Sequence, residues 1–264
     1  MLDFLSETFW AWVVAALIGI VMGCLSYSVS LAYHQLLYYR QKWTHDHAYF
    51  GNGLAKAWAI YSGSSVVVTA LGAAVTYWQP LSAGSGIPDM KTYLNGVQVR
   101  GLLSLPVLIA KMTGVVFAIA GGLICGKEGP FVHGGGIVGS GISGMGSRTV
   151  TEWLRKLGFT KADAKFKGRW ASHFRNKKDH RDFTAIGTAA GVAAAFTAPI
   201  GGLLFTIEEG VSFYSTSVFW RGFLACCLAV LSNNILSSIN AIEHRGTYHE
   251  DPQVRRRSPT FGVE

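Results

Sequence analysis

Long runs without a charged residue dominate the hydrophobic pattern of this chain. Uncharged runs occupy Thr8–Tyr33 and Ala57–Gln79, and Val218–Ile242 contains only Arg221. A helix of roughly 20 apolar residues is long enough to span a bilayer. The pattern therefore predicts three full membrane-spanning helices.

The remaining apolar segments are short or interrupted. Asp89–Val97 is too short to cross a bilayer, and Lys111 lies inside the apolar stretch Leu102–Cys125. Phe183–Ile207 is uncharged, but Pro199 breaks it. Broken helices at membrane depth are tolerated only inside a protein or beside a wet cavity, and in transporters they point to the substrate site. We therefore predict an all-α, polytopic membrane protein with tilted and broken, re-entrant helices.

Polar segments separate the apolar ones. The patch His34–Lys56 contains His45, Asp46 and His47, which we expect to lie in a solvated loop rather than to bind a metal. The end of the chain, from Glu243, is also polar. Such a tail cannot bury enough apolar surface to order itself, so we expect it to be disordered.

The strongest charge cluster is basic. Ten of the 23 Lys and Arg residues lie in the polar stretch Arg155–Arg181. Lys and Arg concentrate in the cytoplasmic loops of membrane proteins, so this stretch predicts a cytosolic loop and not a nucleic-acid surface. The predicted organisation is a transmembrane domain over residues 1–242, with a basic cytosolic loop over 148–182, followed by the tail over 243–264.

Composition agrees with a membrane protein and gives no sign of an enzyme. Charged residues make up 14% of the chain, whereas about 25% is usual in soluble domains. The chain has 32 glycines, and Gly135 and Gly139 have the spacing of helices that pack closely in lipid. The four cysteines lie in apolar segments without CxxC spacing, which argues against a disulfide framework or zinc site. We therefore expect no metal, cofactor or enzymatic activity.

The first interruption is a serine flanked by glycines and followed by a proline: Gly84, Ser85, Gly86, Ile87 and Pro88. Proline suits the first turn of a helix, where free N–H groups and the positive end of the helix dipole favour an anion. The Ser85 hydroxyl adds one more donor. From the residues alone, an ordinary loop with a serine cap fits equally well.

The second interruption repeats the pattern with a carboxylate: Gly126, Lys127, Glu128, Gly129 and Pro130. A helix that begins at Pro130 would again offer free N–H groups. Ionisable residues at membrane depth are rare and usually belong to a functional site. Glu128 could occupy the helix N-terminus as a tethered anion that protonation releases. The alternative is a helix cap in an aqueous turn.

The third interruption follows the small residues Ala193–Ala195. Pro199 opens a second helix, which ends at the paired residues Glu208 and Glu209. Two adjacent carboxylates raise each other's proton affinity, so one of them could carry protons. The alternative is a plain polar helix end.

Together these motifs resemble those of the chloride channel and chloride–proton antiporter (CLC) family. GSGIP at Gly84–Pro88, GKEGP at Gly126–Pro130 and AAFTAPIGGLLFTIEE at Ala194–Glu209 have the family's order and spacing. The resemblance covers about residues 5–240 and implies the first inverted repeat of the CLC fold. The GKEGPFVHGG and EEGVSFY stretches look most like the eukaryotic branch of endosomes, lysosomes and vacuoles.

The resemblance also implies roles for residues. Ser85 is similar to the serine that coordinates the central chloride. Plant members of the family that prefer nitrate have proline at this position, so the serine indicates a preference for chloride. Glu128 is similar to the gating glutamate, and the other GSGIP and GKEGP residues would line the anion site. Glu209 is similar to the internal proton glutamate, with Glu208 as the alternative. Channels of the family usually have valine at that place, so Glu209 favours exchange over passive conduction. Chloride, protons, lipid and a second copy, in a homodimer of the complete protein, are the implied partners.

One departure from the family is large. The second half of a family member supplies a GxFxP helix N-terminus and a tyrosine to the same chloride, and no GxFxP motif follows Glu209 here. The cytosolic nucleotide-binding module of eukaryotic members is also missing. We therefore expect about half of a transporter, whether a fragment, a truncated gene model or a splice product. Alone it should insert into membranes without conducting chloride, so a non-conducting partial subunit stands beside the exchanger and the channel as a third hypothesis.

Overall fold

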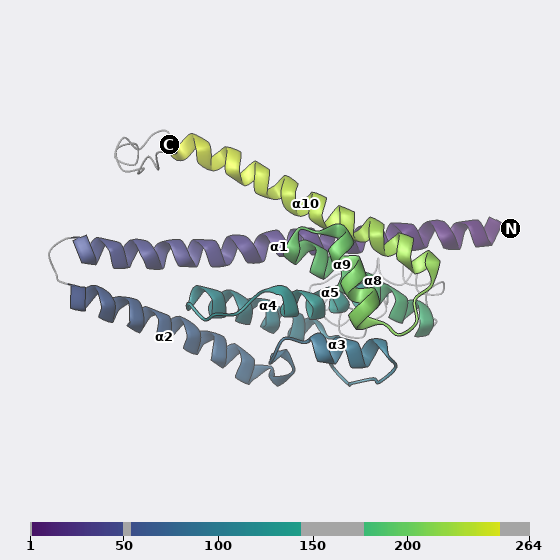
Figure 1. Ribbon diagram of the computed structural model, residues 1–264, viewed down its shortest axis with the longest axis horizontal. Helices are drawn as coiled ribbons and strands as arrows, with labels where there is room; N and C mark the ends of the chain where they lie inside the picture. The colour runs from purple at the N-terminus through teal and green to yellow at the C-terminus, as the bar shows by residue number, and fades with distance from the viewer. Residues whose placement is uncertain (1, 50–53, 144–176, 249–264) are drawn as a thin grey trace, which may run out of the picture.

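Helices make up every element that the computed structural model assigns within the described residues, which are 2–49, 54–143 and 177–248 (Figure 1). In chain order these are α1 (Leu2–Tyr49), α2 (Leu54–Trp78), the 3-10 turn η1 (Pro80–Ser82), α3 (Ile87–Leu94), α4 (Leu105–Ala120), α5 (Glu128–Ser143), α8 (Lys177–Phe196), α9 (Pro199–Phe205), the π-helical turn η2 (Thr206–Gly210) and α10 (Thr216–Tyr248). The predicted all-α class is confirmed.

Three of the described helices are long and apolar enough to cross a membrane. Their spans are Thr8–His45 in α1, Ala55–Trp78 in α2 and Thr216–Asn240 in α10. In Figure 1, α1 and α10 run in the same direction along the molecule, and α2 runs antiparallel to α1. These are the three helices predicted from the uncharged runs.

Three predicted boundaries are wrong because the helices extend into polar sequence. α1 continues to Tyr49, so His45, Asp46 and His47 lie in a helix and not in a loop. The segment His34–Tyr49 contains no Gly or Pro to end the helix. α8 begins at Lys177, before the expected start at Phe183, and α10 continues past Ile242 to Tyr248.

Part of the predicted organisation cannot be compared with the structure. Residues 144–176, which hold most of the basic loop, and residues 249–264, which hold most of the tail, lie outside the described residues. The cytosolic position of Arg155–Arg181 and the disorder of the tail stay predictions.

The centre of the fold is the crossing of α5 and α8, where the two backbones touch. A methyl group at Gly135 would collide with the carbonyl oxygen of Gly187, and one at Gly139 would collide with that of Phe183. A methyl group at Gly191 would likewise meet the carbonyl oxygen of Phe131. The close packing predicted from the spacing of Gly135 and Gly139 is therefore confirmed.

The longer helices enclose this crossing on one side. Apolar residues of α1 and α10 form one buried cluster with α4, α5 and α8: Ala11, Val14, Ile18 and Met22 with Ala225, Ala229, Met112, Phe131 and Ile186. In contrast, α2 has no buried residue in its most apolar window. Its outward side chains, such as Val66, Val67 and Leu71, are exposed and suit contact with lipid tails.

Candidate anion site

The segment Gly84–Gly86 is a tight turn that leads into α3. Gly84 and Gly86 have φ angles of 71° and 82°, a left-handed conformation that residues with a Cβ atom rarely adopt. The first N–H group of α3, on Ile87, donates to Ser85 Oγ at 3.4 Å. Ser85 is exposed, so the turn presents its hydroxyl group at the surface beside the N-terminus of α3.

The N-terminus of α5 carries Glu128 at its first position. The helix therefore begins two residues before the expected start at Pro130. The Glu128 carboxyl group lies over the backbone of Gly126, where an added methyl group would be 2.7 Å from the carboxyl carbon. Glu128 is half-buried and forms no ion pair or hydrogen bond with another described residue. No polar contact therefore holds this carboxylate in place.

The turn before α3 and the start of α5 are in direct contact. A methyl group at Gly129 would lie 2.6 Å from Cβ of Ser85 and 3.0 Å from its carbonyl oxygen. A side chain at position 129 would therefore push the two segments apart. The structure thus brings together the first two interruptions, which are separated by about forty residues in the sequence.

Lys111 of α4 and His133 of α5 lie directly behind this turn. They are 2% and 0% exposed. Lys111 Nζ donates to His133 Nδ1 at 2.8 Å, and His133 Nε2 donates to the carbonyl oxygen of Leu102 at 3.1 Å. Because Nδ1 accepts a bond, the imidazole carries its proton on Nε2. A methyl group at Gly86 would lie 2.7 Å from Lys111 Nζ, so a buried amino group adjoins the turn.

The third interruption lies at a bend between α8 and α9. Thr197 has a φ angle of 54°, which is uncommon for a residue other than glycine, and Pro199 begins α9. The turn η2 follows and contains Glu208 and Glu209, both exposed. It contacts α8 and the C-terminal end of α3, whereas Ser85 precedes the N-terminal end of α3. Since α3 has eight residues, these two ends are about 12 Å apart.

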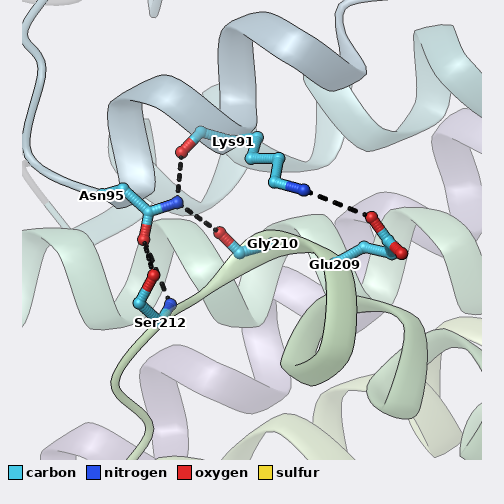
Figure 2. Close-up of polar contacts among 5 residues, drawn as sticks. All are labelled: Lys91, Asn95, Glu209, Gly210 and Ser212. Carbon is cyan, nitrogen blue, oxygen red and sulfur yellow. Dashed lines mark hydrogen bonds and ion pairs between the residues drawn. The ribbon is translucent and has the colours of Figure 1, made fainter.

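Figure 2 shows how η2 is attached to α3. Lys91 Nζ forms an ion pair with Glu209 Oε2 at 3.3 Å, and the two side chains are 54% and 60% exposed. Asn95 Nδ2 donates to the carbonyl oxygens of Lys91 and Gly210 at 2.8 and 3.3 Å. Asn95 Oδ1 accepts from the N–H and Oγ of Ser212 at 3.1 and 2.7 Å. An exposed ion pair adds little stability, so Asn95 contributes most of this attachment.

A comparison with protein families decides what kind of protein carries this arrangement. The family model described as voltage gated chloride channel matches residues 66–256, a range that includes all three interruptions. The chain belongs to the voltage-gated chloride channel family.

Relatives within the voltage-gated chloride channel family are substantially longer than this chain. It is 37% identical over 234 residues to "Chloride channel protein C" of Dictyostelium discoideum, and 37% identical over 234 residues to "H(+)/Cl(-) exchange transporter 7" of Homo sapiens. The alignments cover 88% and 86% of this chain but 29% and 27% of the two relatives. The chain thus spans less than a third of the length of these relatives.

Solved structures of the voltage-gated chloride channel family share the fold. The crystal structure of a eukaryotic CLC transporter matches with a TM-score of 0.69 and 27% identity, covering 89% of this chain and 39% of that one. A slow cyanobacterial Cl⁻/H⁺ antiporter matches with a TM-score of 0.68 at 24% identity, covering 85% of this chain and 46% of that one. The predicted CLC fold is confirmed.

The structure thus adds residues that the motifs of the voltage-gated chloride channel family did not single out. In the sequence, Lys111 differs from its surroundings only as a charged residue inside an apolar run. A charged residue at membrane depth often has a function. His133, Lys91 and Asn95 gave no such signal. Each acquires its contact from a segment that is distant in the sequence or lies in another helix.

Proposed function

We propose that this chain supplies one part of an anion pathway that exchanges chloride for protons across a membrane. The observation that carries the proposal is the contact between the Ser85 turn and Gly129 at the N-terminus of α5. It places two helix N-termini side by side, and helix N-termini offer free N–H donors and partial positive charge. A dehydrated chloride needs several such donors, because burial of an uncompensated ion is costly.

Two further groups support chloride at this place. The Ser85 hydroxyl accepts from Ile87, so its own proton remains available to an anion. The amino group of Lys111, next to Gly86, adds positive potential behind the turn. Glu128 lies at the same helix end without a polar partner among the described residues, so its carboxylate competes with chloride for the N–H groups of α5. Protonation removes the charge of Glu128, so chloride can bind to these N–H groups instead.

Glu209 is the proposed proton acceptor on the other side of the pathway. Its exposed carboxylate can take a proton directly from water. Glu208, its neighbour, is also exposed but forms no ion pair with a described residue. Glu209 rather than Glu208 is attached to the helix that carries the anion turn, which supports its role in coupling.

We further propose that the complete protein is a homodimer in an endosomal, lysosomal or vacuolar membrane. The GKEGPFVHGG and EEGVSFY stretches resemble that branch of the family. The similarity to "H(+)/Cl(-) exchange transporter 7" agrees with exchange rather than passive conduction.

Glu209→Ala tests this function, with Glu208→Ala as its matched control. The chain replaces the corresponding segment of H(+)/Cl(-) exchange transporter 7, and the chimera is reconstituted in liposomes. The parent chimera and Glu208→Ala are expected to show chloride-driven proton uptake. Glu209→Ala is expected to show strongly reduced proton uptake while chloride flux continues. Chloride flux without proton uptake in the parent itself would favour a channel, and no chloride flux would favour a non-conducting subunit. The unaltered chain in the same liposomes measures what it does alone.

Ser85→Pro is expected to shift anion preference from chloride towards nitrate in the same chimera. The substitution removes a hydroxyl donor beside the first N–H groups of α3, and chloride relies on concentrated donors more than the larger nitrate does. The ratio of nitrate to chloride flux measures the shift. Ser237→Ala is the control, because Ser237 is exposed on α10 and its hydroxyl group bonds only within that helix. An unchanged ratio in Ser85→Pro would remove Ser85 from the anion site.

A further inference from the structure

Arg40 is a buried cation inside the apolar span of α1. It is 8% exposed. Its Nη1 donates to Ser65 Oγ and its Nη2 to the Tyr61 hydroxyl, both at 3.1 Å, and the guanidinium group lies 4.7 Å from the centre of the Tyr61 ring. No carboxylate of the described residues forms an ion pair with it, and its buried Nε has no hydrogen-bond partner. A cation in this setting is costly unless an anion compensates it.

An open hollow of about 560 Å³ borders this guanidinium group. The hollow lies between α2 and the loop that follows α4, and Tyr61, Ser65 and Gly122 line it. The same three residues contact Arg40, since a methyl group at Gly122 would lie 3.3 Å from both Nη atoms. The guanidinium group of Arg40 therefore lies directly behind the residues that line one end of the hollow, without being one of them.

The hydroxyl groups at this end are oriented as donors. Tyr61 and Ser65 each accept a hydrogen bond from Arg40, so the proton of each hydroxyl group points away from the cation. The hydroxyl of Thr69, one helical turn further along α2, also lines the hollow. None of the described residues that line it is acidic. The arrangement of one cation and several hydroxyl donors is complementary to an anion with more than one oxygen, such as a phosphate.

The depth of Arg40 matches the headgroup level of a bilayer. Exposed aromatic residues lie near it along the chain, namely Tyr38, Tyr39 and Trp43 on α1, and Trp58 lies one turn before Tyr61 on α2. Trp and Tyr concentrate at the two membrane interfaces. Trp78, also exposed, lies 20 residues beyond Trp58 on α2, a distance of about 30 Å, which is the thickness of the hydrocarbon layer.

The hollow changes from polar to apolar along α2. Tyr61 and Ser65 lie at the end near Arg40, and Val66, Ala70 and Ala73 line the part that reaches deeper into the span. The outward side of α2 is unburied, so the hollow opens towards lipid. Polar groups at the interface with apolar surface below them match a phospholipid, which has its phosphate above its acyl chains.

We propose that Arg40, Tyr61 and Ser65 bind the phosphate of an anionic phospholipid whose acyl chain lies along α2. The lipid supplies the negative charge that the described residues do not supply to Arg40. An anionic headgroup is favoured over a zwitterionic one because the site carries a net positive charge. The site stands apart from the anion turn and does not depend on the proposed transport.

The test uses the chain as it is, purified in a neutral detergent. Native mass spectrometry measures the binding of phosphatidylglycerol and of phosphatidylcholine with the same acyl chains. Phosphatidylglycerol is expected to bind as one retained adduct. Arg40→Gln should lower the affinity for this lipid by about tenfold or more, the change expected from the loss of a charge-assisted hydrogen bond. Arg100→Gln removes an exposed arginine outside the hollow and is the matched control, with binding unchanged.

A second variant guards against misfolding of Arg40→Gln. Ala70→Phe fills the hollow from the exposed side of α2 and leaves Arg40 in place, so it should weaken lipid binding while the elution profile stays that of the parent. Equal binding of phosphatidylglycerol to the parent and to both variants would overturn the proposal, as would equal retention of phosphatidylcholine. Inorganic phosphate at the same concentration should not displace the lipid, and displacement would identify free phosphate as the ligand instead.

Discussion

Glu128→Ala is expected to abolish proton coupling while chloride transport continues. The carboxylate lies at the N-terminus of α5 without an ion pair or hydrogen bond to another described residue, which suits the proposed role of a group that leaves and re-enters the anion path. Alanine leaves the helix N–H groups open to chloride at all times. With no titratable group at this place, proton movement loses its link to anion movement.

The measurement is chloride-driven proton uptake beside chloride efflux in liposomes that contain the chimera with H(+)/Cl(-) exchange transporter 7. Proton uptake in Glu128→Ala should fall to the level of protein-free liposomes, and chloride efflux should persist. Arg100→Ala removes an exposed charge outside the three interrupted segments and is the control, with coupling retained. Chloride-driven proton uptake that survives in Glu128→Ala would show that another group gates the pathway.

Helix α3 joins the two chemical ends of the proposed pathway. The Ser85 turn lies before its first residue, and Lys91 and Asn95 attach its last turn to the segment that contains Glu209. Lys91, the partner of Glu209, lies four residues, or about 6 Å, along α3 from Ile87, the first residue after the anion turn. Because the ion pair with Lys91 requires an ionised Glu209, protonation removes one of the two attachments and leaves the bonds of Asn95. With Glu209 protonated, η2 would stay attached to α3 through Asn95.

The hydrophobic pattern predicted the spans well because it reports a local property. The uncharged runs, with Gly84–Pro88 and Pro199 as breaks, located α2, α3, α9 and most of α10. The end of α1 was missed, because polar residues without Gly or Pro continue a helix as readily as they form a loop. Hydropathy alone does not distinguish these two outcomes.

The contacts of the site were not predictable in the same way. Motifs identified Ser85, Glu128 and Glu209, but not that Gly129 lets the first two segments touch. The bond between Lys111 and His133 and the ion pair between Lys91 and Glu209 depend on how separate helices pack. Sequence spacing within one helix carries no information about such pairs, which only the packed structure reveals.

Gly187→Ala is expected to destabilise the protein strongly, although alanine favours helices by about 1 kcal/mol over glycine. At the crossing of α5 and α8, the added methyl group collides with the carbonyl oxygen of Gly135 and lies 2.9 Å from both N and Cα of Gly139. All of these atoms are backbone, so no side chain can rotate away. The helices must separate, at a cost of about 3 kcal/mol or more.

Gly141→Ala on α5 is the matched control, because a methyl group there meets nothing within 4 Å. It has the same gain in helix propensity without the collision, so its midpoint of thermal unfolding in detergent should equal or exceed that of the parent. The midpoint of Gly187→Ala should lie well below both. Separation of α5 from α8 would also displace Gly129 from Ser85, so chloride transport by the chimera should fall with stability. Equal midpoints for the two variants would mean that the helices do not cross as closely as the glycines indicate.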